Sequence, residues 1–322
     1  MTVWDAAVIG LGRIGMGYDF DSSGASCVLT HASAFHIHPR FQLVGGVDTD
    51  PVKRAAFSEK FGARSFSNVD ELFGELNPFV VALAVPTTHH FDLFRQVERG
   101  SARVLVCEKP IAEHVSDARQ MVEACDRRGQ TILVNYMRRF EPGANSVRSL
   151  IASGELGQVY KGTVWYSKGL LNNGSHFIDL LSYWLGDATD VRLVTCGRTW
   201  GANDPEPDIV ISFGSVNVYF LAAREECFSI SEVELVGTAG KLQYRRGGAS
   251  IRLWKTARDP VYSGYTALDE NPITIPNDLQ RYQFHVLQHL AEYLDGAAPS
   301  LPSTGATALR TLDIIDRIRQ QL

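Results

Sequence analysis

The chain has 322 residues, of which 45% are hydrophobic and 21% charged, a composition typical of a globular protein with a substantial core. Its net charge is −5 and no run of lysine and arginine forms a basic stripe, which argues against a nucleic-acid partner. With no apolar run near the roughly 18 residues of a membrane span, no signal-peptide pattern and no closely spaced pair among its five cysteines, we expect a cytoplasmic protein without a membrane partner.

Strand and helix signals alternate through the first 136 residues, which predicts a parallel sheet with crossover helices. Short apolar runs bounded by turn residues indicate the strands, and amphipathic stretches between them indicate the helices. This first domain is therefore expected to be α/β and doubly wound. The expected strands span residues 6–9, 42–47, 80–85, 104–107 and 131–135, and the expected helices span 51–61, 68–76, 91–98 and 115–128.

The pattern changes after residue 139, where β-like runs separated by Gly- and Asp-rich turns dominate. We expect an α+β second domain with a large, mostly antiparallel open sheet, and we divide the chain into domains 1–136 and 137–322. The expected strands span 159–166, 191–196, 208–213, 216–221, 231–236, 241–244 and 250–254, and the expected helices span 142–153, 176–185, 278–294 and 304–320.

The segment Gly10-Leu11-Gly12-Arg13-Ile14-Gly15 fits the GxGxxG fingerprint and directly follows the first expected strand. In a Rossmann fold the first glycine allows a tight turn, the second lets the backbone approach a pyrophosphate, and the third lets the helix pack on the strand. The alternative is a plain glycine-rich turn. The position after a strand favours a dinucleotide site formed by Gly10, Gly12, Arg13, Ile14 and Gly15.

Asp48 ends the second expected strand, where a carboxylate can accept hydrogen bonds from the adenosine ribose and repel a 2′-phosphate. NAD is therefore favoured over NADP, although Lys53 and Arg54 lie close enough to blur this choice; Asp48 as a simple turn residue is the alternative. From Gly15 to Asp48 the chain runs 33 residues, against about 20 in the usual pattern. The excess is assigned to Tyr18–Gly24, which interrupts the first crossover helix and either overhangs the cofactor or is an inert insertion.

Lys109 follows the strand at 104–107, and Pro110 cannot continue that strand. The lysine is thus expected at the carboxyl end of the sheet, where open α/β sheets bind their ligands. Beside a nicotinamide it is a candidate proton carrier for alcohol–ketone chemistry. The alternative is a structural lysine paired only with Glu108.

Histidines supply the other candidates. His176 is expected in the first turn of a helix that begins near Gly174, although a lone histidine is more often a hydrogen-bonded structural residue. His89 and His90 follow a strand end and are candidates to line the cofactor crevice. The alternative for such a pair is a metal site, which we do not expect because no third ligand stands at a recognisable spacing. Trp165 and Tyr166, next to Lys168, either line a substrate pocket or form a packed sheet face.

Together these motifs resemble the Gfo/Idh/MocA family of glucose–fructose oxidoreductases and inositol dehydrogenases. The resemblance covers nearly the whole chain. It implies an NAD(P)-binding Rossmann domain, a second domain that holds the substrate and forms a homodimer or homotetramer interface, and hydride transfer to or from a secondary hydroxyl of a sugar, nucleotide-sugar or cyclitol. The motifs that carry it are Gly10–Gly15, Asp48, the segment 84–90, Glu108-Lys109-Pro110, the segment 135–142 and the segment 174–179.

The same resemblance implies that Lys109 and His176 handle the hydroxyl proton. It also implies that the cofactor lies against Pro86, Thr87, His90, Glu108 and Lys109, and the substrate against Lys109, Tyr166, Lys168, Asn172 and His176.

The chain departs from the family pattern at Asn172, where many members carry aspartate four residues before the histidine. Asparagine can orient the imidazole but adds no charge, so Lys109 is expected to carry more of the proton transfer. A second departure is the short connection 166–172, which leaves little room for a long substrate loop. Two alternatives to a dehydrogenase stay open here: an NAD(P)-binding sensor of the same fold and an NAD-dependent glycoside hydrolase.

Overall fold

The computed structural model describes residues 2–22 and 24–322. The chain divides into two compact units. Unit 1 contains the residues up to Phe140 together with 280–312, and unit 2 contains 141–279 and 313–322, so the division falls inside helix α9 (Gly305–Arg319). Residues 280–312 therefore group with unit 1, whereas the sequence-based division placed everything after residue 136 in the second domain.

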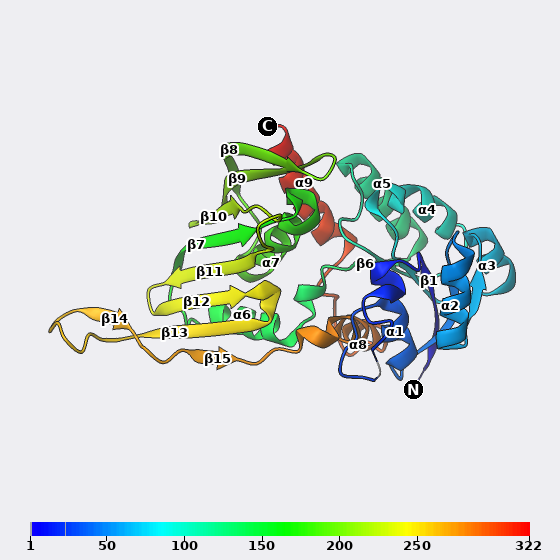
Figure 1. Cartoon of the computed structure of the whole chain (residues 1–322), viewed down its shortest axis with the longest axis horizontal. Helices are drawn as coiled ribbons and strands as arrows, with labels where there is room; N and C mark the ends of the chain where they lie inside the picture. Colours follow the sequence, from blue (N-terminus) through cyan, green and yellow to red (C-terminus); the bar gives the residue numbers. More distant parts are fainter. Residues whose placement is uncertain (1, 23) are drawn as a thin grey trace. The chain divides into compact units, whose positions relative to one another are not determined.

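Unit 1 is built on a six-stranded, entirely parallel sheet in the order β3-β2-β1-β4-β5-β6 (Figure 1). This is the doubly wound Rossmann order, and the predicted fold class is confirmed. The pattern did not reveal β3, which has only three residues. The strands are β1 (Trp4–Ile9), β2 (Phe41–Val47), β3 (Arg64–Phe66), β4 (Val80–Leu83), β5 (Val104–Cys107) and β6 (Thr131–Val134).

Helices cover both faces of this sheet. Phe57 of α2 and Leu72 of α3 pack over Gly46 and Gly45, two neighbours on β2 that face opposite sides. Local signals set the helix ends; the carboxylate of Asp50, for example, accepts a hydrogen bond from the Val52 amide at the start of α2. The helices are α1 (His31–Ile37), α2 (Pro51–Phe61), α3 (Val69–Glu75), α4 (His90–Val97), α5 (Val115–Arg128) and α8 (Tyr282–Leu294).

Helix α8 belongs to unit 1 because of its apolar face. Val286, Leu287 and Leu290 are buried in the same hydrophobic cluster as the strands of the parallel sheet. Burying each of these three side chains stabilises the packing by roughly 1.5–3 kcal/mol. This helix therefore packs with unit 1, although it follows the strands of the second sheet in sequence.

The first crossover is interrupted, as predicted. A single turn (Arg13–Gly17) follows the glycine loop, and α1 begins only at His31. Within the predicted insertion, Ser23 lies outside the described residues. Asp19 is buried, and its carboxylate accepts hydrogen bonds from the Leu29 amide (2.6 Å), the Thr30 amide (3.1 Å), Thr30 Oγ1 (2.6 Å) and Ser33 Oγ (2.9 Å). The segment is therefore fixed to the start of α1 through the buried carboxylate of Asp19.

Unit 2 contains a nine-stranded sheet that is mostly antiparallel, as predicted. The exception is the pairing of β7 with β10, which is parallel. Helices α6 and α7 and the last turns of α9 pack on one face of this sheet and share its hydrophobic core. The elements are α6 (Pro142–Ala152), β7 (Val159–Tyr166), α7 (Ser175–Leu185), β8 (Asp190–Trp200), β9 (Asp204–Phe213), β10 (Val216–Ala222), β11 (Ser231–Gly237), β12 (Gly240–Arg245), β13 (Ser250–Arg258), β14 (Thr266–Leu268) and β15 (Ile273–Ile275).

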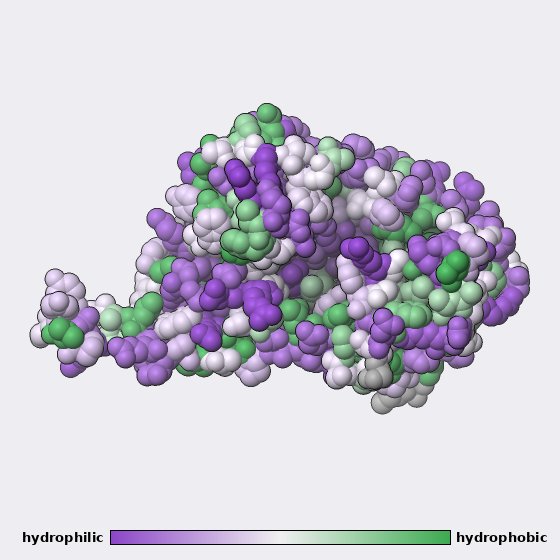
Figure 2. All heavy atoms as spheres, viewed as in Figure 1, coloured by the Kyte–Doolittle hydropathy of each residue, from purple (hydrophilic) through white to green (hydrophobic). Residues whose placement is uncertain are grey.

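Strands β13 and β14 form a hairpin that extends beyond the rest of this sheet (Figure 1). Its tip exposes Val261, Tyr262 and Tyr265, and Figure 2 shows hydrophobic atoms at the projecting end. Among the described residues, no helix is long and apolar enough to cross a membrane.

Candidate active site and cofactor cavity

A cavity of about 600 Å³ opens at the carboxyl ends of β1, β2 and β4 in unit 1. Four residues expected from the sequence to bind the cofactor line it: Gly10, Gly12, Asp48 and Pro86. Its location is the one at which doubly wound sheets bind nucleotides. The other lining residues are Ile9, Val47, Thr49, Lys53, Ser67, Asn68, Val69, Ala84, Val85, His89, Asp92, Leu93 and Gln96.

The glycine loop has the geometry that a pyrophosphate requires. Gly10 has a φ of +95°, and a Cβ there would lie 2.6 Å from the Ala84 carbonyl oxygen, so no larger residue fits. A Cβ at Gly12, in contrast, would meet no atom within 4 Å, which leaves room for a ligand at the cavity wall. These residues fit a bound dinucleotide. Arg13 is exposed and Ile14 packs on the core of unit 1, and cofactor contact by either stays a prediction.

Asp48 holds this loop in place. Its carboxylate accepts hydrogen bonds from the amides of Leu11 and Asp50, both at 2.9 Å, and Lys53 Nζ lies 3.6 Å away. The side chain therefore joins the end of β2 to the glycine loop and also faces the cavity. Its predicted contact with the adenosine ribose remains a prediction.

The two adjacent histidines have different environments. His89 lines the cavity, whereas His90 is fully buried behind it. The His90 ring nitrogens lie 3.0 Å from the carbonyl oxygens of Val85 and Pro110, and burial holds the pKa of the imidazole below its usual value. His90 thus links the end of β4 to the segment after Lys109, and its contact with the cofactor stays a prediction. Thr87 is half-buried in the turn before them and is not among the cavity residues.

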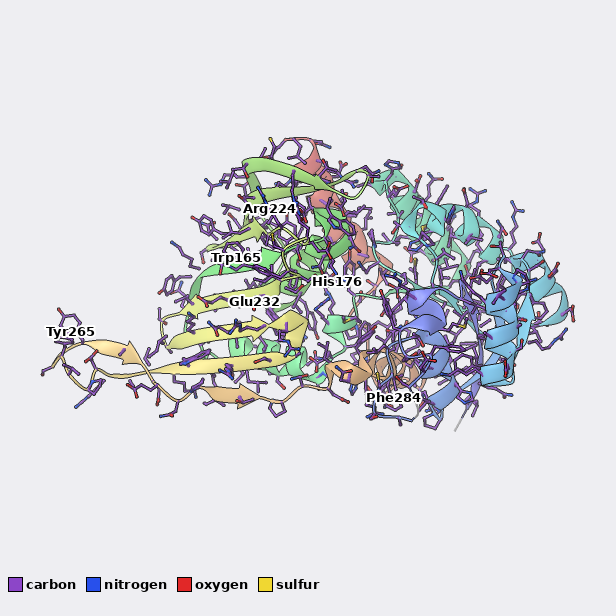
Figure 3. The ribbon with its side chains drawn as sticks, in the orientation of Figure 1. Trp165, His176, Arg224, Glu232, Tyr265 and Phe284 are labelled. Carbon is purple, nitrogen blue, oxygen red and sulfur yellow. The ribbon has the colours of Figure 1, made fainter. Side chains whose placement is uncertain are left out.

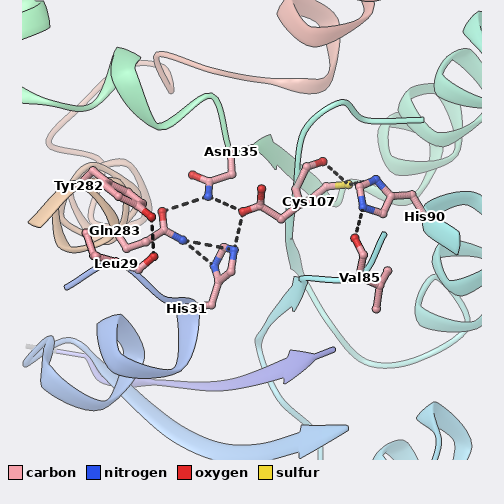
Figure 4. A network of polar contacts seen from close by, with 9 residues as sticks. Leu29, His31, Val85, His90, Cys107, Asn135, Tyr282 and Gln283 are labelled. Carbon is pink, nitrogen blue, oxygen red and sulfur yellow. Dashed lines mark hydrogen bonds and ion pairs between the residues drawn. The ribbon is translucent and has the colours of Figure 1, made fainter. Parts of the chain in front are cut away.

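Lys109 is half-buried just beyond the end of β5, and the Lys109–Pro110 peptide bond is cis. The preceding Glu108 is buried, with its Oε1 atom 2.8 Å from His31 Nε2 and 2.6 Å from Asn135 Nδ2 (Figure 4). Burial acts to raise the pKa of this carboxyl, but the hydrogen bonds from His31 and Asn135 and the positive charge of Lys109 outweigh it and lower the pKa. An ionised carboxylate therefore stands next to the candidate proton carrier.

In unit 2, His176 lies in the first turn of α7, as predicted, and is half-buried (Figure 3). A turn over Gly169–Gly174 leads into this helix. Within that turn, Asn172 donates a side-chain hydrogen bond to the Lys168 carbonyl (3.1 Å), and Lys168 pairs with Glu225 at 3.6 Å. Catalytic and substrate-binding roles for His176, Asn172 and Lys168 stay predictions.

Two buried acids that the sequence analysis missed anchor this turn. The Asp204 carboxylate accepts the amides of Leu171 and Asn172, both at 2.8 Å, and Glu206 accepts the Gly169 amide at 3.1 Å. Both acids lie on β9, which is far from the turn in sequence. The only sequence feature that marked these two acids was the alternation of acid and proline in Asp204-Pro-Glu206-Pro, which is more typical of a turn than of a site.

Tyr166 does not line an open pocket. It is fully buried in the core of unit 2, and its hydroxyl donates to the Pro207 carbonyl at 2.6 Å. Burial raises the pKa of this hydroxyl well above its usual value. The neighbouring Trp165 points to the other face of β7 and is 42% exposed (Figure 3). Of the two interpretations of this pair, the packed sheet face is correct for Tyr166, and its assignment to the substrate site is corrected accordingly.

The described residues contain no group of three or more His, Cys, Asp or Glu side chains placed to hold a metal ion. All five cysteines are free thiols, and only Cys196 and Cys227 are exposed.

Comparison with known proteins agrees with this geometry. The family model described as "Oxidoreductase family, NAD-binding Rossmann fold" (Gfo/Idh/MocA) matches residues 5–136. The inositol 2-dehydrogenase of Rubrobacter xylanophilus is 30% identical over an alignment of 260 residues, gaps included, that covers 74% of this chain and 74% of that protein. The chain belongs to this family. It is therefore an NAD(P)-binding oxidoreductase, and the relatives favour a dehydrogenase over the sensor and hydrolase alternatives.

Other members extend the similarity over most of the chain. The D-apiose dehydrogenase of Rhizobium rhizogenes is 22% identical over an alignment of 306 residues, gaps included, that covers 84% of each protein. The crystal structure of the WlbA dehydrogenase from Bordetella pertussis, in complex with NADH and UDP-GlcNAcA, superposes with a TM-score of 0.77 at 18% identity and covers 99% of this chain and 95% of that one. This family member thus shares the complete fold of a known dehydrogenase.

Proposed function

We propose that this family member transfers a hydride between a nicotinamide cofactor and a secondary alcohol or ketone of a sugar, nucleotide-sugar or cyclitol. The observation that carries the proposal is the cavity lined by Gly10, Gly12 and Asp48 at the end of the parallel sheet, where the residues fit a dinucleotide. When bound there, NAD(H) supplies the hydride acceptor or donor. Relatives named as dehydrogenases of inositol and D-apiose support the polyhydroxylated substrate class.

Lys109 and His176 are proposed to handle the hydroxyl proton. Lys109 is half-buried beside an ionised Glu108, which suits a lysine that holds or donates a proton. His176 is placed by a turn whose backbone amides are fixed by buried acids. Asn172 and Lys168, in and before that turn, are proposed to bind substrate hydroxyls, and we infer that Asn172 orients His176 without charging it.

The decisive experiment is a fluorescence titration with NADH and NADPH, followed by turnover on a panel of sugars, cyclitols and nucleotide-sugars. Lys109→Ala should lower kcat at least about 100-fold with the NADH Kd little changed, because general acid–base groups typically contribute 10²–10⁴-fold. Lys161→Ala, at an exposed lysine of β7, is the matched control and should retain turnover. An unchanged kcat in Lys109→Ala would remove the proposed role, and tight NADH binding without turnover on any substrate would favour a sensor.

Asp48 is proposed to select NAD over NADP, since its carboxylate would repel a 2′-phosphate. In Asp48→Asn, which can still accept the Leu11 amide, the ratio of the Kd for NADPH to the Kd for NADH should fall about tenfold or more, corresponding to about 1.4 kcal/mol. Asp92→Asn, at another wall of the same cavity, is the control for a general change of charge. Equal ratios in wild type and Asp48→Asn would contradict this assignment.

We also infer that the protein is a cytoplasmic homodimer or homotetramer. Val261, Tyr262 and Tyr265, which are exposed together at the tip of the β13–β14 hairpin, support an assembly, because monomers rarely expose large apolar side chains in groups. Light scattering of the purified protein gives the mass directly, and a monomer at micromolar concentration would contradict the inference.

A further inference from the structure

A closed set of hydrogen bonds includes Glu108, the neighbour of Lys109 in sequence, and joins four separate parts of unit 1 (Figure 4). Its members are His31 at the start of α1, Glu108 at the end of β5, Asn135 after β6 and Gln283 on α8. All four side chains are buried. The role proposed for Lys109 does not by itself explain why His31 and Gln283 occur in this set.

The hydrogen-bond geometry assigns the His31 tautomer. Gln283 Nε2, a donor, lies 3.0 Å from His31 Nδ1 and 3.2 Å from His31 Nε2, and Gln283 Oε1 accepts from Asn135 Nδ2 at 3.0 Å. Because the Glu108 carboxylate can only accept, the His31 Nε2 atom 2.8 Å from Glu108 Oε1 is the donor, and Nδ1 accepts from Gln283. Together with the 2.6 Å bond from Asn135 Nδ2, this places two donors on one oxygen of Glu108.

The long insertion after the glycine loop is what brings His31 to this position. Asp19 binds the amides of Leu29 and Thr30, and the Thr30 side chain caps the first turn of α1 by accepting the Ser33 amide. The insertion is also anchored to the other side of the set, because the Tyr282 hydroxyl donates to the Leu29 carbonyl at 2.7 Å. The extra residues of the first crossover thus build a rigid support for His31.

The support acts on the charge of Glu108. Burial alone favours the neutral carboxylic acid, and the bonds from His31 and Asn135 reverse that preference. The other titratable groups that interact with Glu108 are Lys109, His90, Cys107 and Tyr282. His90, Cys107 and Tyr282 are neutral in their ordinary buried forms, and His31 carries no charge in the tautomer whose Nδ1 accepts from Gln283. The Lys109 ammonium is then the cation that a Glu108 carboxylate stabilises.

We propose that His31 is a positioning residue for the reaction: it keeps the Glu108 carboxylate charged and oriented beside Lys109, so that Lys109 transfers its proton next to a fixed negative charge. This inference rests on the proposed function, since the step it supports is the proton transfer assigned to Lys109. His31 itself touches neither substrate nor cofactor in this role.

The kinetic test compares His31→Leu, which removes the donor, with His31→Gln, whose side-chain amide can still donate to Glu108. His31→Leu should lower kcat about tenfold, in the range known for outer partners of active-site ligands, with a KM change below about twofold and an altered pH profile of kcat. His31→Gln should recover most of the loss. Equal losses in both variants, accompanied by equal falls in Tm, would indicate a purely structural residue and overturn the proposal.

A second readout does not require turnover. The rate at which acetic anhydride labels Lys109, followed by mass spectrometry against pH, reports how readily its ammonium loses a proton. In His31→Leu the midpoint of this curve should move to lower pH, because a Glu108 carboxylate that has lost its His31 partner is no longer held beside Lys109 and stabilises the ammonium less, whereas His31→Gln should match wild type. If the curve shifts but the protein turns over no substrate, the proposed function is refuted, while the effect of His31 on Lys109 through Glu108 is still supported. Superimposable curves in wild type and His31→Leu would refute the coupling itself.

Discussion

Asp19 offers a direct test of the claim that the insertion is a structural support. Its buried carboxylate accepts four hydrogen bonds, from the Leu29 and Thr30 amides and from the hydroxyls of Thr30 and Ser33. Asp19→Ala removes the acceptor. The Leu29 amide belongs to a half-buried residue and can bind water, but the three donors of Thr30 and Ser33 are buried and would be left without this partner.

At roughly 1 kcal/mol for each buried donor left unsatisfied, the expected loss of stability is about 3 kcal/mol. Hydrogen exchange measured by mass spectrometry on peptides that cover residues 24–37 reports the local opening free energy, and urea unfolding followed by circular dichroism reports the global one. The matched control is Asp21→Ala, which removes an exposed carboxylate from the same loop and should change either value by less than about 0.5 kcal/mol.

If residues 24–37 are as well protected from exchange in Asp19→Ala as in Asp21→Ala, the claim that Asp19 holds the insertion is refuted. It would mean that the carboxylate is dispensable and that other contacts, such as the one between Tyr282 and Leu29, hold the loop. Loss of protection combined with the kinetic phenotype of His31→Leu would instead connect the insertion to the proton-transfer site.

Two further predictions concern other regions. Burial lowers the folded-state pKa of His38, so below about pH 6.5 the unfolded chain binds a proton that the folded chain does not. The free energy of unfolding should therefore fall as the pH drops from 6.5 to 5. In urea unfolding, His38→Gln should flatten this pH dependence, whereas His36→Gln, at an exposed residue of α1, should not. Gly169 has a φ of +81°, and a Cβ there would collide with the Asp204 carboxylate; Gly214 has a φ of +60° and open space around it. Gly169→Ala should therefore destabilise the protein by at least about 1 kcal/mol more than Gly214→Ala does. Equal Tm values for the two alanine variants would argue against the close packing of this turn.

Where an element depends on local chemistry, the sequence predicted it closely. The helix expected over 51–61 is α2, because Asp50 caps its start, Pro51 suits the first turn and Gly62 adopts the left-handed conformation at its end. The helix expected over 115–128 is α5. The glycine fingerprint also depends on neighbouring residues alone, and the structure places Gly10 and Gly12 at the cavity.

The sequence was less informative where adjacent residues of one kind face different surroundings. His89 and His90 are equivalent in composition, yet only the first lines the cavity, because the direction of each side chain depends on the turn that ends β4. Tyr166 and Trp165 likewise alternate across β7, and which face is buried depends on the helices that pack on the sheet.

The sequence by itself therefore determined the class of each domain and the alternation of strands and helices, which rest on short-range periodicity and capping. Its short motifs gave the nucleotide fingerprint and carried the resemblance to the family. Only the tertiary structure decided the pairing of β7 with β10, the inclusion of α8 in unit 1, the anchoring of the turn before His176 by Asp204 and Glu206, and the contact between His31 and Glu108. Each of these joins residues that are far apart in the chain. Such contacts form because buried polar groups must find partners and apolar faces must be covered, and a single sequence does not specify which distant residue meets that need.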